Sequence, residues 1–129
     1  MSDEIAGFIP EGKRPAAGKW DKFYLELCQK YSEMSKDPST RVGSIIVRPD
    51  NTLCSAGYNG FCRQMNDSPE RYADRDFKVK VIIHAEINAL IHAREQVNGY
   101  TVYTTPGLSC PRCCVQLLES GVSRFVAPV

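Results

Sequence analysis

The chain has 129 residues, 43% of them hydrophobic and 24% charged, which is enough for one hydrophobic core and too short for two ordinary domains. Its 16 basic and 15 acidic side chains leave a net charge of +1, without the basic excess of a protein that binds a long polyanion. Because the chain has no apolar run of membrane-spanning length and no signal-peptide layout, we expect a cytoplasmic protein that binds neither a membrane nor a polynucleotide.

The N-terminal part divides into an arm and a helix. Residues 1–18 are polar, contain glycine and proline and lack periodicity, so we expect a flexible arm ahead of a folded domain over residues 19–129. From Trp20 the apolar side chains recur at helical spacing until Asp37-Pro38 stops the pattern. One face of this first helix should therefore be buried.

The rest of the chain alternates between strand and helix patterns. Two β-branched runs separated by Pro-Asp-Asn predict a β-hairpin, and a charge-dense stretch with helix breakers predicts a long loop that includes one helical turn. The expected elements are strands at 42–47 and 52–58, a loop at 60–80, a helix from 84 to about 95, a strand at 100–105, a helix from 110 to about 120 and a strand at 124–127. A β-hairpin followed by αβαβ predicts an α/β fold, a three-layer α-β-α sandwich.

Two short motifs place metal-binding side chains at the starts of two expected helices. His84-Ala-Glu86 opens one helix, and Cys110-Pro-Arg-Cys113 opens the other. A catalytic zinc needs three protein ligands, an open position for water and a nearby carboxylate that stays off the metal. We therefore expect His84, Cys110 and Cys113 to bind zinc and Glu86 to carry protons. The order H-x-E and then C-x-x-C is typical of zinc-dependent nucleobase deaminases.

Each half of this pattern has a simpler interpretation when it is taken alone. C-x-x-C also occurs in structural zinc sites and in redox pairs, and a carboxylate such as Glu86 is stabilised by the dipole at a helix start. A structural zinc would need a fourth ligand, but Cys114 would point about 100° around the helix from its neighbour Cys113. With no export signal the thiols should be reduced. The cysteines expected to serve as packing residues are Cys28, Cys54, Cys62 and Cys114.

Five segments strengthen the deaminase interpretation. They are Ser35-Lys-Asp-Pro38, Arg41-Val-Gly43, Gly57-Tyr-Asn-Gly60, His84-Ala-Glu-Ile-Asn-Ala89 and the Cys110/Cys113 pair. Together they resemble the deoxycytidylate (dCMP) deaminases of the cytidine deaminase superfamily, whose pattern has proline where this chain has Ser109. The resemblance implies the cytidine deaminase fold and zinc-dependent hydrolysis of dCMP to dUMP and ammonia, which supplies dUMP for thymidylate synthesis.

The resemblance also implies roles for residues that contact the substrate. Asn59 would hydrogen-bond the sugar 3′-hydroxyl, although an Asn-Gly pair is also typical of turns. Lys36 and Arg41 would bind the 5′-phosphate at the mouth of the pocket. Ala85 and Ser109, beside the metal ligands, are expected to contact the substrate too.

Regulation and assembly follow from the same resemblance. Family members are commonly homohexamers activated by dCTP and inhibited by dTTP with Mg²⁺, so we expect an oligomer, with a hexamer favoured. The expected effector-binding residues lie in and after the G-Y-N-G loop and are Gly57, Tyr58, Gly60 and Arg63. Arg63 is also a candidate for the phosphate contact. We expect one zinc per chain, because the segment before His84 offers only Cys62 as an extra ligand.

Three other functions share parts of this pattern. A tRNA adenosine deaminase should carry a basic surface, and a deaminase of a free nucleoside or base would need no phosphate-binding cation. A catalytically inactive zinc protein that serves as a scaffold would not need Glu86. Phe61 and Tyr103 are candidates either for stacking on a base or for the core.

Overall fold

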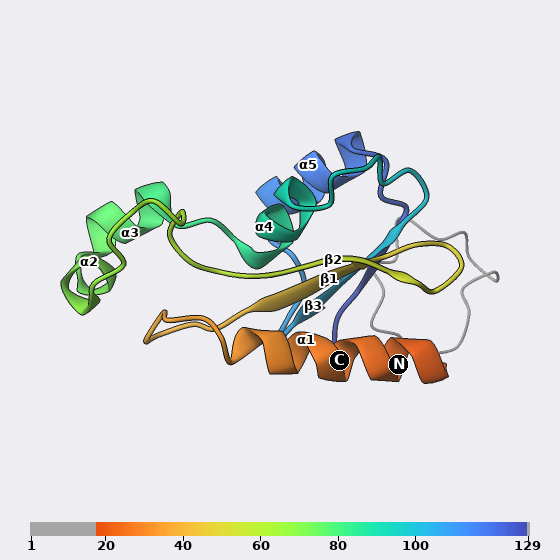
Figure 1. Ribbon diagram of the computed structural model, residues 1–129, viewed down its shortest axis with the longest axis horizontal. Helices are drawn as coiled ribbons and strands as arrows, with labels where there is room; N and C mark the ends of the chain where they lie inside the picture. The colour runs from red at the N-terminus through yellow and green to blue at the C-terminus, as the bar shows by residue number, and fades with distance from the viewer. Residues whose placement is uncertain (1–17, 129) are drawn as a thin grey trace.

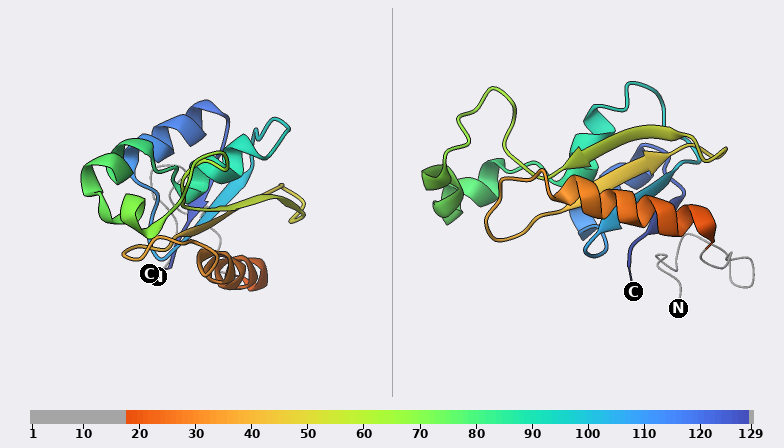
Figure 2. Two further views of the ribbon diagram at one scale, coloured as in Figure 1. Left: turned by 60° about the vertical axis from the view of Figure 1, so that its left-hand side comes forward. Right: turned by 60° about the horizontal axis from the view of Figure 1, so that its bottom comes forward.

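The computed structural model describes residues 18–128 of the chain (Figures 1 and 2). The arm expected at residues 1–18 lies, apart from Gly18, outside this range. The elements are α1 (Lys19–Ser32), β1 (Gly43–Val47), β2 (Leu53–Tyr58), α2 (Pro69–Ala73), α3 (Arg75–Val81), α4 (Ala85–Ile91), β3 (Thr101–Thr105), α5 (Pro111–Glu119) and β4 (Arg124–Val126). Among these helices, none is both long and apolar enough to cross a bilayer.

The four strands form one mixed sheet in the order β2-β1-β3-β4. β1 and β2 pair antiparallel across a short turn, in which Asn51 has a φ of 70° that asparagine tolerates better than most residues. β3 pairs antiparallel with the other edge of β1 and parallel with β4. The predicted hairpin and the two later predicted strands are therefore confirmed.

Helices cover both faces of the sheet. Alternate residues of β1 point to opposite faces, so Ile45 packs with Tyr24 of α1, whereas Ile46 packs with Ala89 of α4 and Leu117 of α5. Figure 1 shows α1 on one side of the strands and α4 and α5 on the other. The predicted three-layer α-β-α sandwich is confirmed, and its layers bring the starts of α4 and α5 to one end of the sheet.

Residues 61–82 leave the sandwich and return to it. Two backbone hydrogen bonds close this excursion, from Gly60 N–H to the Ile83 oxygen at 3.1 Å and from Ile83 N–H to the Gly60 oxygen at 2.8 Å. The prediction of a long loop with one helical turn was wrong, because the excursion contains two helices, α2 and α3 (Figures 1 and 2). The Asp74 carboxylate caps α3 by accepting the Phe77 N–H at 3.2 Å.

The helix that carries Glu86 is shorter than expected. α4 ends at Ile91, whereas the sequence pattern predicted an end near Glu95. Beyond Ile91 the chain departs from helical geometry, and Arg94 has a φ of 58°. This turn leads the backbone away from the helix toward β3.

Candidate metal centre and active site

The three expected metal ligands lie together at the starts of two helices. His84 is the N-cap residue of α4, Cys110 is the N-cap residue of α5, and Cys113 follows in the first turn of α5. Nδ1 of His84 lies 3.5 Å from Sγ of Cys110 and 3.2 Å from Sγ of Cys113, and the two sulfur atoms are 3.2 Å apart. Three soft or borderline donor atoms therefore converge on one point.

This donor set fits a tetrahedral zinc ion with one open position. Zinc bond lengths of about 2.3 Å to sulfur and 2.0 Å to nitrogen place neighbouring donors about 3.5–3.8 Å apart, slightly wider than the separations here. Within residues 18–128, His84, Cys110 and Cys113 are the only group of three or more histidine, cysteine or acidic side chains that converge in this way. This finding suits one metal ion per chain.

The surroundings of Cys113 disfavour the thiolate form of its side chain. Burial raises the pKa of the Cys113 thiol, and the neighbouring Cys110 and Glu86 raise it further. A divalent cation acts in the opposite direction, because a thiol that coordinates a metal loses its proton. The Cys114 thiol donates instead to the Ser109 carbonyl oxygen at 3.6 Å, so it does not join the donor cluster.

Glu86 occupies the first turn of α4 and is 3% exposed. Its position depends on a close approach between α4 and β2, made possible by Gly57. A Cβ atom at Gly57 would lie 2.7 Å from both the Ala85 oxygen and the Ala89 nitrogen, so any larger residue would push α4 away. The glycine thus helps to set where the carboxylate of Glu86 and the imidazole of His84 lie.

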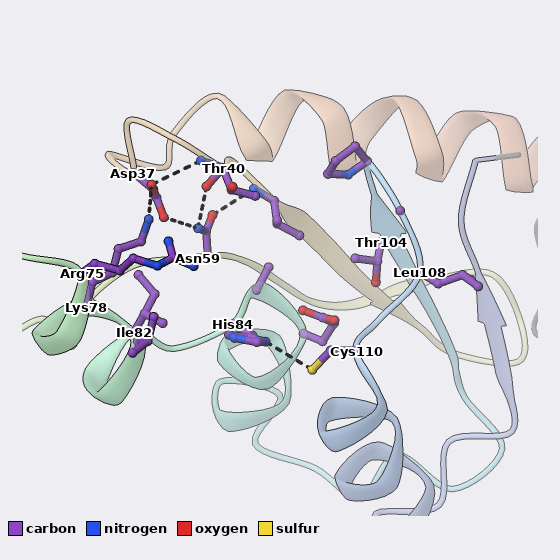
Figure 3. Close-up of a pocket in the computed structure, with 16 residues that line it drawn as sticks. Asp37, Thr40, Asn59, Arg75, Lys78, Ile82, His84, Thr104, Leu108 and Cys110 are labelled. Atoms are coloured by element: carbon purple, nitrogen blue, oxygen red, sulfur yellow. Dashed lines mark hydrogen bonds and ion pairs between the residues drawn. The ribbon is translucent and has the colours of Figure 1, made fainter. Parts of the chain in front are cut away.

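His84 and Cys110 line a cavity of about 410 Å³ that is also lined by Glu86, with Cys113 buried behind them (Figure 3). Small-molecule sites usually fall in the range of about 300–1,000 Å³. Figure 3 shows Thr104 and Leu108 along one side, Asp37 and Lys78 along the opposite side, and His84 between them. The cavity therefore has enough room for one nucleotide beside the metal centre.

Asn59 holds a neighbouring loop in place while it lines this cavity. Its Oδ1 accepts the Val42 N–H at 2.9 Å, and its Nδ2 donates to the Thr40 oxygen at 2.8 Å and to Oδ2 of Asp37 at 3.3 Å. Both amide hydrogens are therefore used inside the protein. One lone pair of Oδ1 is left to accept a hydrogen bond from a ligand.

Asp37 is a buried carboxylate, 1% exposed, on the same side of the cavity. Burial raises its pKa, but the hydrogen bond from Lys78 and those from the Ser39 and Thr40 backbone lower it by more, so its pKa lies below the usual value. Nζ of Lys78 is 2.8 Å from Oδ1 of Asp37. This ion pair connects α3 to the loop before β1.

Lys36 and Arg41, expected to bind the phosphate, do not line the cavity that contains His84. They line a separate hollow beside Tyr72, and Nζ of Lys36 is paired with Oδ2 of Asp67 at 3.0 Å. Lys36 is also exposed, so this pair is open to solvent. The structure thus separates both cations from the metal centre.

The cations that do line the cavity are Arg75 and Lys78, neither of which belongs to a motif recognised in the sequence. The available signal was their spacing with the apolar residues Val79 and Ile82. These positions follow the i, i+3, i+4 and i+7 pattern of one helical face, and all four line the cavity.

The remaining expected substrate residues lie at or near the cavity. Ala85 lines it directly and is fully buried. Oγ of Ser109 is 3.4 Å from Oγ1 of Thr104, which lines it. The two aromatic candidates belong to the protein interior instead, because Phe61 stacks on Tyr72 at 4.3 Å and the buried Tyr103 lies in the α1 side of the core.

The four expected effector residues lie around a second cavity. This cavity has a volume of about 540 Å³ and includes none of the three metal donors. Its lining includes Gly57, Tyr58, Gly60 and Arg63. The two cavities share no lining residue, so ligands at the two places would not compete for the same side chains.

Comparison with known proteins agrees with the geometry of the metal centre. Residues 18–128 match the family model described as the cytidine and deoxycytidylate deaminase zinc-binding region. The chain is 32% identical over 110 residues to an uncharacterized deaminase of the luxG 3′ region of Aliivibrio fischeri, covering 85% of this chain and 73% of that protein. It is 37% identical over 105 residues to a probable deoxycytidylate deaminase of Caenorhabditis elegans, covering 78% of this chain. It spans 53% of the nematode protein, about half its length.

A solved structure shares the fold. The crystal structure of a dCMP deaminase from the cyanophage S-TIM5, in complex with dCMP and dUMP, superimposes with a TM-score of 0.63. The match covers 84% of this chain and 79% of the phage chain, at 21% identity. At this level of identity the likeness establishes a common architecture, in agreement with the sandwich described above.

Proposed function

This chain belongs to the cytidine and deoxycytidylate deaminase zinc-binding family, a family of enzymes, and we propose that it hydrolyses the bond between C4 of dCMP and its amino group to give dUMP and ammonia. The observation that carries the proposal is the convergence of His84, Cys110 and Cys113 beside Glu86 in a nucleotide-sized cavity. Relatives named as deoxycytidylate deaminases in animals and in a mycobacteriophage support the choice of substrate.

The proposed chemistry assigns proton transfer to Glu86. A zinc ion held by His84, Cys110 and Cys113 would supply a Lewis acid that lowers the pKa of a water molecule from ~16 toward ~7. Glu86 accepts a proton from the water that attacks C4 of the base, delivers a proton to N3 and helps to protonate the departing amino group. Because Glu86 is buried beside the donor atoms, bulk water has little access to these transfers.

Asn59 and the loop around Ser109 would orient the nucleoside part. The free lone pair on Oδ1 of Asn59 suits the 3′-hydroxyl of the sugar, which would donate the hydrogen bond. Ala85 would contact the base with its backbone and small side chain at the start of α4. These contacts would place C4 toward the metal donors.

We also propose that the protein assembles and is regulated as its resemblance to dCMP deaminases implies. The second cavity of about 540 Å³, with Tyr58 and Arg63 in its lining, would take dCTP as activator or dTTP with Mg²⁺ as inhibitor. The outer faces of α4 and α5 expose the apolar side chains of Ile91 and Val115, which suit contacts between subunits of a homohexamer. Light scattering, and dCMP assays with and without each triphosphate, test these two proposals.

The main proposal is tested by assaying zinc-loaded protein on dCMP, CMP, deoxycytidine and a tRNA while ammonia release is measured. We expect dCMP to be the preferred substrate and the variant Glu86→Gln to be nearly inactive on all four. Equal turnover of deoxycytidine and dCMP would show that the protein is a nucleoside deaminase and would reject the proposed nucleotide substrate. Activity on the tRNA alone would reject both.

A further inference from the structure

One wall of the metal-binding cavity is a face of α3. The side chains on this face run from cationic to apolar along the helix, in the order Arg75, Lys78, Val79 and Ile82. Ile82 is two residues before the metal donor His84, whereas Arg75 lies about 10 Å further back along the helix axis. The cavity thus has a metal end and a cationic end, and Figure 3 shows Arg75 and Lys78 grouped on one side of it.

The two cations of this wall differ in how the fold uses them. Nζ of Lys78 is 2.8 Å from Oδ1 of Asp37 and 2.9 Å from Oγ of Ser39, so part of its donor capacity holds α3 in place. The Arg75 guanidinium is exposed and makes no ion pair or side-chain hydrogen bond within residues 18–128. Two cations against the single carboxylate of Asp37 leave this end of the cavity positively charged.

We propose that Arg75, assisted by Lys78, binds the 5′-phosphate of the substrate and thereby makes the enzyme select nucleotides over nucleosides. This inference rests on the proposed deaminase function. A base that reacts beside His84 must have its phosphate in the same cavity, and Arg75 and Lys78 are the lysine and arginine side chains that line it.

The chemistry of the two side chains suits this task. A guanidinium group binds a phosphate through two parallel N–H···O hydrogen bonds, and the ammonium group of Lys78 has an N–H left after its two contacts with Asp37 and Ser39. The apolar side chains of Val79 and Ile82 lie between the cationic end and the metal end, where the sugar and the edge of the base would pass.

The test compares dCMP with deoxycytidine in the zinc-loaded enzyme. Arg75→Ala should lower kcat/KM for dCMP about ten- to hundredfold, because a charge-assisted contact is lost, while kcat/KM for deoxycytidine stays within about twofold. Arg75→Lys should recover part of the loss. The zinc content should be the same in all variants, since Arg75 is remote from the donor atoms.

Matched control variants come from the same excursion. Lys80 lies on α3 but does not line the cavity, and Arg71 lies on α2 with its guanidinium over the Phe77 ring at 5.2 Å. Lys80→Ala and Arg71→Ala should leave the ratio of the two kcat/KM values unchanged. If Lys36→Ala or Arg41→Ala lowers this ratio and Arg75→Ala does not, the phosphate is bound at the other hollow and the inference is overturned.

A binding measurement separates this inference from the proposed function. Calorimetric titration with dUMP and with deoxyuridine requires no turnover, and Arg75→Ala should weaken binding of dUMP only. If Arg75→Ala weakens the binding of dUMP and deoxyuridine equally, or weakens neither, the phosphate contact is overturned even in an enzyme that deaminates dCMP. If the parent protein has no deaminase activity but still binds dUMP through Arg75, the proposed function fails and the phosphate site stands.

Discussion

The Asn59 side-chain amide donates a hydrogen bond to Oδ2 of Asp37 at 3.3 Å, and both residues line the metal-binding cavity. Asn59 also accepts from Val42 and donates to Thr40, so one side chain fixes the loop before β1 and faces the substrate space. A substitution at this position therefore affects stability as well as binding.

Asn59→Asp should give a pH-dependent loss of stability. It places a second carboxylate against Asp37, which raises the pKa of the pair and should cost about 2–3 kcal/mol of unfolding free energy at pH 7. The deficit should shrink as the pH falls and one carboxylate takes up a proton. Urea unfolding from pH 7 to pH 4 measures this, with Asn59→Ala as the uncharged control. A deficit that is constant with pH would show that repulsion from Asp37 is not its cause.

The metal ligands are tested by zinc content. Cys113→Ala should lose most of the zinc that the parent protein holds, which we expect to be one ion per chain, because two donors do not hold the ion tightly. Cys114→Ala should retain it, since the Cys114 thiol is directed to the Ser109 carbonyl oxygen. Elemental analysis by mass spectrometry measures the zinc content of the purified variants. Loss of zinc from the Cys114 variant alone would refute the ligand assignment.

Glu86→Gln should separate metal binding from proton transfer. The amide keeps the shape of the side chain but cannot carry protons, so turnover of dCMP should fall about 10²–10⁴-fold while zinc content and melting temperature are kept. Glu119→Gln, at an exposed position on α5, serves as the control. A Glu86 variant with activity within a few-fold of the parent would reject its proton-transfer role.

The close approach of β2 to α4 predicts a steric effect. Gly57→Ala should lower the unfolding free energy by about 1–3 kcal/mol, because the new Cβ would lie 2.7 Å from backbone atoms of Ala85 and Ala89. Activity should fall too, since α4 carries Glu86. Gly107→Ala is the control for stability, as its Cβ would meet no atom within 4 Å. Equal stability of the two variants would contradict the packing described here.

A second buried carboxylate predicts acid sensitivity away from the active site. Asp21 of α1 accepts hydrogen bonds from Tyr103 at 2.6 Å and from Arg124 at 2.6 and 3.0 Å. Burial raises the pKa of Asp21, but these contacts, chiefly that with Arg124, lower it below its ordinary value of 3.8. The carboxylate therefore stabilises the fold above pH 3.8, and this contribution is lost as the pH falls through its pKa in the folded state.

Asp21→Asn should accordingly cost about 3 kcal/mol near neutral pH, because one partner of a buried ion pair is removed. The difference from the parent should narrow below about pH 4. Denaturant unfolding at several pH values tests this, with the exposed Asp76→Asn as the control. If the loss of unfolding free energy in Asp21→Asn is the same at pH 3, the loss comes from packing and not from the charge of Asp21.

The sequence predicted the sandwich and the convergence of His84 with Cys110 and Cys113 because both are encoded locally. His84 and the two cysteines lie at helix starts whose apolar periodicity is visible in the sequence, and the short Pro-Asp-Asn turn marks the β1–β2 hairpin. The excursion was harder to predict. α2 and α3 have five and seven residues, too few for a clear period, and they depend on contacts such as the stacking of Phe61 on Tyr72.

The cations that line the cavity, Arg75 and Lys78, could not be predicted from the sequence. Lys36 and Arg41 lie near motif residues in the chain, and chain proximity was the only available guide to their position. The folding of α3 back toward Asp37 brings Lys78, 41 positions later, against the same loop. Such a contact depends on the path of the whole excursion, which no short motif specifies.

The two-bond closure at Gly60 and Ile83 makes residues 61–82 a separable insert. Its ends are held at adjacent points of the sandwich, so its length and composition can change in evolution while the spacing between His84 and the cysteines is kept. Diversification of substrate choice within this architecture would then proceed by exchange of the insert, with the reactive centre inherited intact. Grafting residues 61–82 onto a relative would transfer preference for a substrate without transferring the catalytic residues.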